Sequence, residues 1–195
     1  DVADFDPVVE FMKREAARHG VALDRPVTIA LAPEVTSPPP PTPAWNDNPL
    51  SIAWWSLKMR YWSWKVDTYP GPEPDIRLYV EYHNSGENGV LDTSFGLQKS
   101  RISVIRQFTS RRMARKNQVI IAHELLHTLG ASDKYDLSTL AVSYPEGYAE
   151  PNKSPLYPQQ KAEIMGGRIP VNAREFVIPA SLEQCIVGPE TAREI

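Results

Sequence analysis

Residues 118–133 read QVIIAHELLHTLGASD, and we expect the rest of the fold to be built around this segment. Its first part is apolar enough to form a buried helix, and Gly130 can adopt the left-handed conformation that ends a helix and turns the chain. His123 and His127 are four residues apart, so a helix places both imidazoles on one face, about 6 Å apart along its axis. We therefore expect a buried helix over about residues 112–129 that directs two imidazoles to one point.

This histidine spacing is typical of a zinc site. Two neutral imidazoles four residues apart can bind one Zn²⁺ at about 2.0–2.1 Å each. Glu124 follows the first histidine, where its carboxylate can reach a metal-bound water without ligating the metal. A shuffled chain of this composition would contain H-E-x-x-H only about 0.006 times. The pattern therefore favours Zn²⁺ bound by His123 and His127 over two core histidines that need no metal.

The residue types left in the chain indicate that the third ligand is a carboxylate. Only one cysteine is present, at position 185, so no thiolate pair can complete the site. Asp133 lies three residues after Gly130, where a reversed chain could return to the metal. The alternatives are the acidic residues further along the chain, Asp136, Glu146, Glu150 and Glu163. Prolines at 145 and 151 argue against a second helix carrying a ligand in that segment, so we favour Asp133.

The full pattern, H-E-x-x-H-x-x-G-x-x-D, resembles that of the metzincin clan of zinc endopeptidases, in which the third ligand is usually histidine. The Asp variant looks most like the snapalysins, small secreted neutral proteases. The clan has a methionine turn below the metal, and residues 163–167 (EIMGG) are similar to it, with Met165 as its methionine. Lys134, after the third ligand, matches no metzincin subfamily marker. The resemblance therefore extends to the clan and not to a subfamily.

The resemblance implies a zinc-dependent endopeptidase acting on a protein or peptide. Glu124 would take a proton from a zinc-bound water that attacks the peptide carbonyl, and would return it to the leaving amine. Tyrosines that follow the motif are candidates to stabilise the oxyanion: Tyr135, Tyr148 and Tyr157, with Tyr144 as a fourth. The substrate would lie along an edge strand within residues 90–98 by main-chain pairing. The alternative is a zinc-stabilised interaction module without turnover.

The remaining sequence predicts the elements around this helix. We expect helices over 6–20, 50–67 and 181–187, and strands over 26–32, 75–82 and 101–108. The segment over 50–67 contains four of the chain's five tryptophans, at positions 54, 55, 62 and 64, together with Tyr61. We expect it to pack against the sheet by its heavier aromatic face. A sugar-stacking or membrane-interface surface is the alternative for these aromatics.

Length and proline distribution bound the architecture. A chain of 195 residues is expected to form a single zinc metallopeptidase domain. The expected fold class is α/β, of α+β zincin-like type: a twisted mixed sheet with an active-site helix, a Met-turn and a small C-terminal part over about 134–195. The proline-rich stretch over about 37–49 is expected to be a connector. Prolines are absent between Pro74 and Pro145, where regular structure should concentrate.

Charge and hydropathy exclude several partners. Lys+Arg 21 against Asp+Glu 24 gives a net charge of -3, so we expect neither a nucleic-acid partner nor an anionic membrane as partner. No apolar run approaches the roughly 18–20 residues that span a bilayer, so we expect no membrane partner for this chain. The likeness to secreted proteases weakly favours an extracytoplasmic location, secreted or in a bacterial cell envelope. A signal or anchor upstream of Asp1 would lie outside this sequence.

Overall fold

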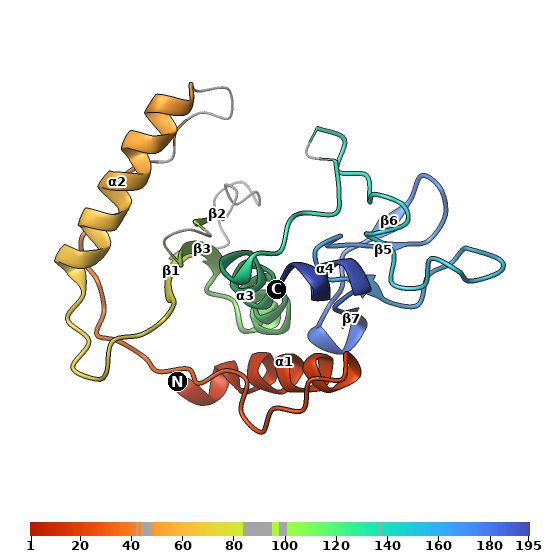
Figure 1. Cartoon of the computed structure of the whole chain (residues 1–195), viewed down its shortest axis with the longest axis horizontal. Helices are drawn as coiled ribbons and strands as arrows, with labels where there is room; N and C mark the ends of the chain where they lie inside the picture. The colour runs from red at the N-terminus through yellow and green to blue at the C-terminus, as the bar shows by residue number, and fades with distance from the viewer. Residues whose placement is uncertain (42, 44–47, 84–94, 98–100, 137) are drawn as a thin grey trace.

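A computed structural model describes residues 1–41, 43, 48–83, 95–97, 101–136 and 138–195 (Figure 1). The α-helices are α1 (Asp6–Arg18), α2 (Pro49–Val66), α3 (Ala114–Leu129) and α4 (Pro189–Glu194), and the 3₁₀ turns are η1 (Val2–Phe5), η3 (Arg111–Met113) and η4 (Leu182–Gln184). The strands are β1 (Arg77–His83), β2 (Phe95–Leu97), β3 (Ile102–Phe108), β4 (Ala162–Glu163), β5 (Ile169–Pro170), β6 (Phe176–Val177) and β7 (Cys185–Ile186). The mixed α/β class expected from the sequence is confirmed at this level.

The largest described sheet has three strands in the order β1-β3-β2. β1 runs parallel to β3, with Arg77 opposite Ile102, and β2 runs antiparallel to β3, with Phe95 opposite Val104. The sheet is therefore mixed, as expected. The strands predicted over 75–82 and 101–108 are confirmed as β1 and β3. Of the expected edge segment over 90–98, residues 95–97 form β2, and 90–94 and 98 lie outside the described residues.

Alternate side chains of β3 face two different helices, because successive residues of a strand point to opposite faces. Ile102 and Val104 pack in one apolar cluster with Trp55 and Met59 of α2. Ile105, on the opposite face, belongs to the main core with α1 and α3. The helices α2 and α3 therefore cover opposite faces of the sheet, and Figure 1 shows α2 at the outer edge of the molecule.

Helix α3 is the central helix of the main core. Its buried side chains include Ala122, Leu125 and Leu126, which pack with Val8 and Phe11 of α1. The predicted bounds, 112–129, agree with α3 together with the 3₁₀ turn before it. The prediction of a helix over 6–20 is likewise confirmed as α1, and that over 50–67 as α2.

Two predicted elements are wrong. Residues 26–32 form neither strand nor helix, and Val27 and Ile29 pack half-buried on the main core, where none of the described strands pairs with them. Residues 181–187 form a 3₁₀ turn followed by β7, which pairs with β4. The guanidinium of Arg14 donates hydrogen bonds to the carbonyls of Leu182 and Cys185, and the first of these would accept from residue 186 in the expected helix. The C-terminal helix comes later, as α4.

Candidate metal centre

Three side chains converge after the end of α3: His123, His127 and Asp133. One potential ligand atom from each side chain lies within 4.8 Å of those from the other two. In the described part of the chain, this is the one group of three or more His, Cys, Asp or Glu side chains close enough together to hold a metal ion. The Oδ1 atom of Asp133 lies 3.3 Å from Nε2 of His123 and 3.2 Å from Nε2 of His127. All three side chains are largely but not fully buried, with exposed fractions of 15–26%. The centre is therefore reachable from solvent.

The other ring nitrogen of each histidine contacts a backbone carbonyl. Nδ1 of His123 lies 3.0 Å from the carbonyl oxygen of Ile164, and Nδ1 of His127 lies 2.8 Å from that of Ala131. A carbonyl oxygen only accepts, so each Nδ1 must carry the proton. In the neutral histidines this leaves the Nε2 lone pairs directed at the centre. Metal-ligating histidines commonly have an outer contact of this kind, which fixes tautomer and ring orientation.

The site thus gathers three acceptor atoms without a hydrogen-bond donor between them. Oδ1 of Asp133 is buried and has no hydrogen-bond partner, although both Nε2 atoms are near, which fits nitrogens that carry no proton. Four ligands around a tetrahedral ion at 2.0–2.1 Å are separated by about 3.3 Å, which agrees with both Nε2–Oδ1 distances. Two imidazoles and one carboxylate suit several first-row divalent ions. The donor set and its spacing therefore fit a metal ion.

The electrostatics also show that the centre attracts positive charge. Burial alone would lower the pKa of His127, but the contact with Asp133 overcomes it and raises that pKa. Burial would raise the pKa of Asp133, but the two histidines hold it well below its usual range. Each shift stabilises positive charge beside the carboxylate. A cation at the centre would satisfy the same acceptors.

The position of Asp133 depends on how α3 ends. Gly130 has φ 127°, which strains any residue with a side chain, and its N–H donates to the carbonyls of Leu126 and His127. The chain then reverses, and the N–H of Lys134 donates to the carbonyl of Met165 at 2.9 Å. The ammonium of Lys134 is buried and contacts both carboxylate oxygens of Glu194 in α4 at 2.7 Å. Asp133 is therefore held between a helix end and an anchored lysine.

Glu124 lies on α3 beside His123 but outside the group of potential ligands. Its side chain is buried, and the hydroxyl of Ser103 in β3 donates to its Oε2 at 3.2 Å. Burial raises the pKa of Glu124, an effect partly offset by the neighbouring His123 and His127. A carboxylate with a raised pKa next to a metal centre is suited to accept and return a proton.

Residues 163–167 pass beneath the centre, where the sequence predicted a methionine turn. Met165 is fully buried, and the carbonyl of Ile164 is the one that contacts His123. Glu163 anchors this segment to the C-terminal part: its carboxylate accepts hydrogen bonds from the N–H groups of Gly166 and Gly188 and from the Thr191 hydroxyl. This segment therefore holds the imidazole of His123 in place through a backbone carbonyl.

The four alternative carboxylates lie outside the group of potential ligands in the described part of the chain. Asp136 accepts hydrogen bonds from Ser138 and Thr139, which lower its pKa to about 2. Glu150 accepts from the N–H of Gln160, and Glu146 is exposed. Glu163 is engaged as described above. Of the five candidates, the structure brings only Asp133 to the two histidines.

The three predicted oxyanion tyrosines separate into two groups. Burial raises the pKa of Tyr135 to about 12, and the negative charge and hydrogen bond of Asp133 contribute to this rise, so this phenol lies beside Asp133. The hydroxyls of Tyr148 and Tyr157 instead lie 3.0 Å from each other. Tyr148 also packs its ring against Tyr144. Within the described residues, Tyr148 contacts Tyr157 and Tyr144, and neither Tyr148 nor Tyr157 forms a hydrogen bond with the three potential metal ligands.

Several groups that contact the centre belong to no sequence motif, so their role was not predicted from the sequence. The carbonyls of Ile164 and Ala131 are backbone groups, which any residue could provide. Ser103 and Glu194 come from distant elements, β3 and α4, and have no fixed spacing from the histidines. Only Lys134 was singled out, as a residue that matches no subfamily marker.

Comparison with known protein families, with curated proteins and with solved structures finds no match to this chain. No helix in the described part of the chain has the length and hydropathy needed to cross a membrane.

Proposed function

We propose that the chain is a zinc-dependent endopeptidase of the metzincin type. The observation that carries this proposal is the convergence of two Nε2 lone pairs and Oδ1 of Asp133, with the buried carboxylate of Glu124 beside them. Catalytic zinc sites use three protein ligands and leave a further position open. The finer fold assignment, a zincin-like domain with a Met-turn around Met165, belongs to the same proposal.

His123, His127 and Asp133 would hold the zinc, and Zn²⁺ bound there would supply Lewis acidity towards a peptide carbonyl and an attacking water. Glu124 would take the proton of that water and return it to the leaving amine nitrogen. Ser103 orients the Glu124 carboxylate from β3. Tyr135 is the one candidate phenol that lies against Asp133, so it would donate to the oxyanion.

The sheet offers a surface for an extended substrate. β2 is the edge strand next to β3, and it lies against α3, which carries Glu124. An edge strand has unpaired main-chain groups that can pair with a peptide. The substrate would therefore lie as an added strand along β2, with one peptide bond near the metal. This arrangement supports a peptide as the substrate class.

The test is cleavage of a peptide library by zinc-loaded wild-type protein beside Glu124→Gln. We expect the substitution to lower kcat/KM by at least about 10²–10⁴-fold, the range for general acid–base catalysis, with unchanged zinc content. Equal cleavage by both proteins would overturn the proposal. If zinc is bound and stabilises the fold but neither protein cleaves any peptide, the alternative, a zinc-stabilised interaction module, replaces it.

A further inference from the structure

Helix α2 has an exposed apolar face opposite to the one that packs on the sheet. Its inner face buries Trp55, Met59 and Trp62. A second row of apolar side chains recurs at steps of four and three residues, which at 3.6 residues per turn forms one stripe along the helix. This α2 stripe consists of Leu50, Trp54, Leu57, Tyr61 and Trp64, whose exposed fractions are 81, 61, 54, 62 and 74%.

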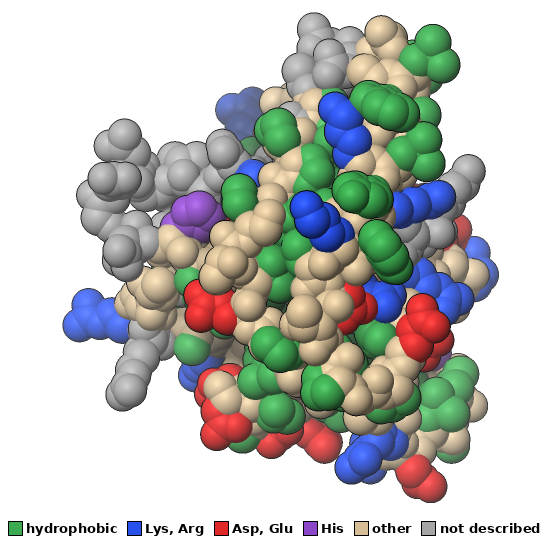
Figure 2. All heavy atoms as spheres, turned by 90° about the vertical axis from the view of Figure 1, so that its left-hand side faces the viewer, with side chains coloured by type: hydrophobic (Ala, Val, Ile, Leu, Met, Phe, Trp, Pro, Cys, Tyr) green, Lys and Arg blue, Asp and Glu red, His purple; other side chains and the backbone are tan. Residues whose placement is uncertain are grey.

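Single exposed apolar residues are ordinary, but a continuous row of large ones marks an interaction site. α2 stands at the outer edge of the molecule (Figure 1), and each side chain of the stripe is more than half exposed. Figure 2, viewed from that side, shows hydrophobic side chains interspersed with Lys and Arg over the upper half, where α2 lies, and acidic side chains gathered in the lower half. The surface around the stripe is therefore both apolar and basic, although the net charge of the whole chain, -3, by itself predicts no anionic membrane partner.

Three exposed cations flank the stripe. At 3.6 residues per turn, Lys58 and Lys65 lie along one side of it and Arg60 along the other. The ammonium of Lys58 lies 5.8 Å from the centroid of the Trp54 ring, a cation–π distance. α2 contains no Asp or Glu. Within the described residues no ion pair neutralises any of the three, so the stripe complements an anionic partner.

A second copy of the chain fits this face poorly. Steps of four and three residues are those of a coiled-coil seam, and Lys58, Arg60 and Lys65 occupy the positions beside that seam. In a parallel pair, Arg60 of one helix would face Lys65 of the other. In an antiparallel pair, the side with Lys58 and Lys65 would face its own copy. Either arrangement places like charges together, which is destabilising.

We propose that the α2 stripe binds the surface of an anionic lipid bilayer. Trp and Tyr side chains favour the membrane–water interface, where an apolar ring and a polar edge are both accommodated. Lys and Arg can extend from the apolar layer to lipid phosphates. α2 is held to the sheet by Met59 and Trp62 and does not span a membrane, so it would lie flat on the bilayer. The contact is independent of the metal centre.

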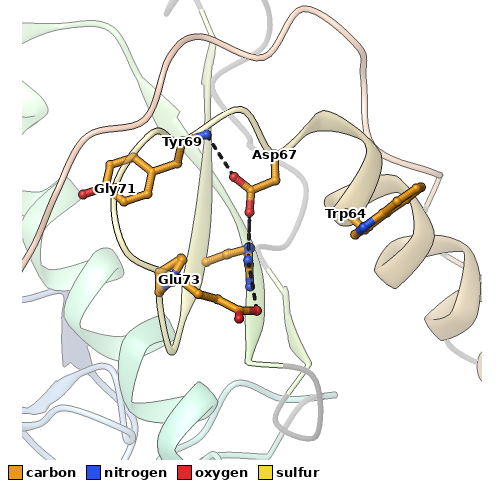
Figure 3. A pocket seen from close by; sticks show the side chains of 7 residues that line it. Trp64, Asp67, Tyr69, Gly71 and Glu73 are labelled. Atoms are coloured by element: carbon orange, nitrogen blue, oxygen red, sulfur yellow. Dashed lines mark hydrogen bonds and ion pairs between the residues drawn. The ribbon is translucent and has the colours of Figure 1, made fainter.

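The loop that follows α2 contributes its own charged groups next to the stripe. A cavity of about 300 Å³ opens beside Trp64, lined by Trp64, Asp67, Tyr69, Gly71, Glu73, Pro74 and Arg77. Figure 3 shows the Trp64 ring on the helix, apart from the Asp67–Arg77–Glu73 contacts across the cavity. Two carboxylates offset one guanidinium there. Arg77 therefore adds no net positive charge to the surface around the stripe, and its exposed cations are Lys58, Arg60 and Lys65.

The test is sedimentation of the full chain with phosphatidylcholine vesicles, with and without phosphatidylglycerol. We expect binding to vesicles that contain phosphatidylglycerol, and weaker binding as salt is raised. Trp54→Ser should lower the vesicle affinity at least about tenfold, whereas Ile178→Ser, at an equally exposed apolar residue, should not change it. Lys58→Glu should lower it at least about tenfold, whereas Lys13→Glu, the same charge change on α1, should have a much smaller effect.

Several results would overturn the membrane proposal. One is the absence of vesicle binding at low salt, and another is equal binding to vesicles without phosphatidylglycerol. A third is equal loss in the Lys58→Glu and Lys13→Glu proteins, which would reflect net charge alone. Self-association that Trp54→Ser abolishes, without vesicle binding, would assign the stripe to a second copy. An acidic protein that binds the stripe when vesicles do not would assign it to a protein partner.

Discussion

Helices α3 and α2 cover opposite faces of the same sheet, but they use their side chains differently. α3 buries Leu125 and Leu126 in the core and directs polar side chains to one centre. α2 is apolar on two opposite faces, of which only the one with Met59 is buried. The contrast teaches that residue type alone does not set burial, because a sheet face covers only one side of a helix. The two proposals above place metal chemistry on α3 and a surface contact on α2.

The largest effect expected from this division is on metal affinity. His127→Ala removes one ligand and should lower zinc affinity by more than about 100-fold, because loss of an outer contact alone typically costs about 10–100-fold. Trp54→Ser, in α2, should leave the affinity unchanged. Competition with a chromophoric chelator measures both. Similar losses in the two proteins would mean that the helices are not independent.

The second prediction compares the two faces of α2 itself. Met59 is fully buried against β3, and Leu57 is 54% exposed. Met59→Ala should lower the free energy of unfolding by about 2–5 kcal/mol, because it leaves a cavity, and Leu57→Ala by less than about 0.5 kcal/mol. Urea denaturation measures the difference. Equal losses would show that the α2 stripe is buried in the protein in solution.

The third prediction concerns the support beneath the α3 centre. The Glu163 carboxylate accepts from three donors, two backbone N–H groups and the hydroxyl of Thr191. Glu163→Gln turns an amide NH₂ towards at least one of them, so the free energy of unfolding should fall by about 1–3 kcal/mol. Glu190→Gln, at a more exposed surface pair, should change it by less than about 0.5 kcal/mol. An unchanged free energy of unfolding in Glu163→Gln would contradict the anchoring role of this residue.

The smallest effect is expected where α2 meets β1. The backbone N–H of Tyr69 and then Arg77 lower the pKa of Asp67. An acid with a lowered folded pKa stabilises the fold above its unfolded pKa, about 3.9, and loses that contribution as pH falls. Asp67→Asn should therefore cost about 0.2–1 kcal/mol at neutral pH and nothing at strongly acidic pH. Thermal unfolding across pH measures this, and a loss that persists in acid would rule out the charge as its cause.

The sequence allowed the core of the centre to be predicted because helical geometry links residues four apart. His123 and His127 required only a helix, and Asp133 required only that Gly130 end it. The same local reasoning located α1, α2, β1 and β3. Ser103 and Glu194 escaped prediction, because a contact between distant elements depends on the complete fold.

Where local patterns failed, tertiary contacts had decided the structure. Residues 26–32 (PVTIALA) form a short, mostly apolar run that suits a buried strand, but no described strand pairs with them. Residues 181–187 do not form the expected helix, because Arg14 binds the carbonyl of Leu182 and residues 185–186 pair with β4. In α2, tryptophans 55 and 62 are buried and 54 and 64 are exposed, although all four are the same residue type. Which aromatic face the sheet covers could not be read from composition.

The most direct test of the metal assignment is the zinc content per chain after dialysis, compared between Asp133→Asn and Asp136→Asn. The two aspartates are three residues apart, but only Asp133 lies within 3.3 Å of both imidazoles. We predict one zinc in the wild-type chain and in Asp136→Asn, and a large loss in Asp133→Asn. Full zinc retention by Asp133→Asn, or loss by Asp136→Asn alone, would contradict the proposed centre.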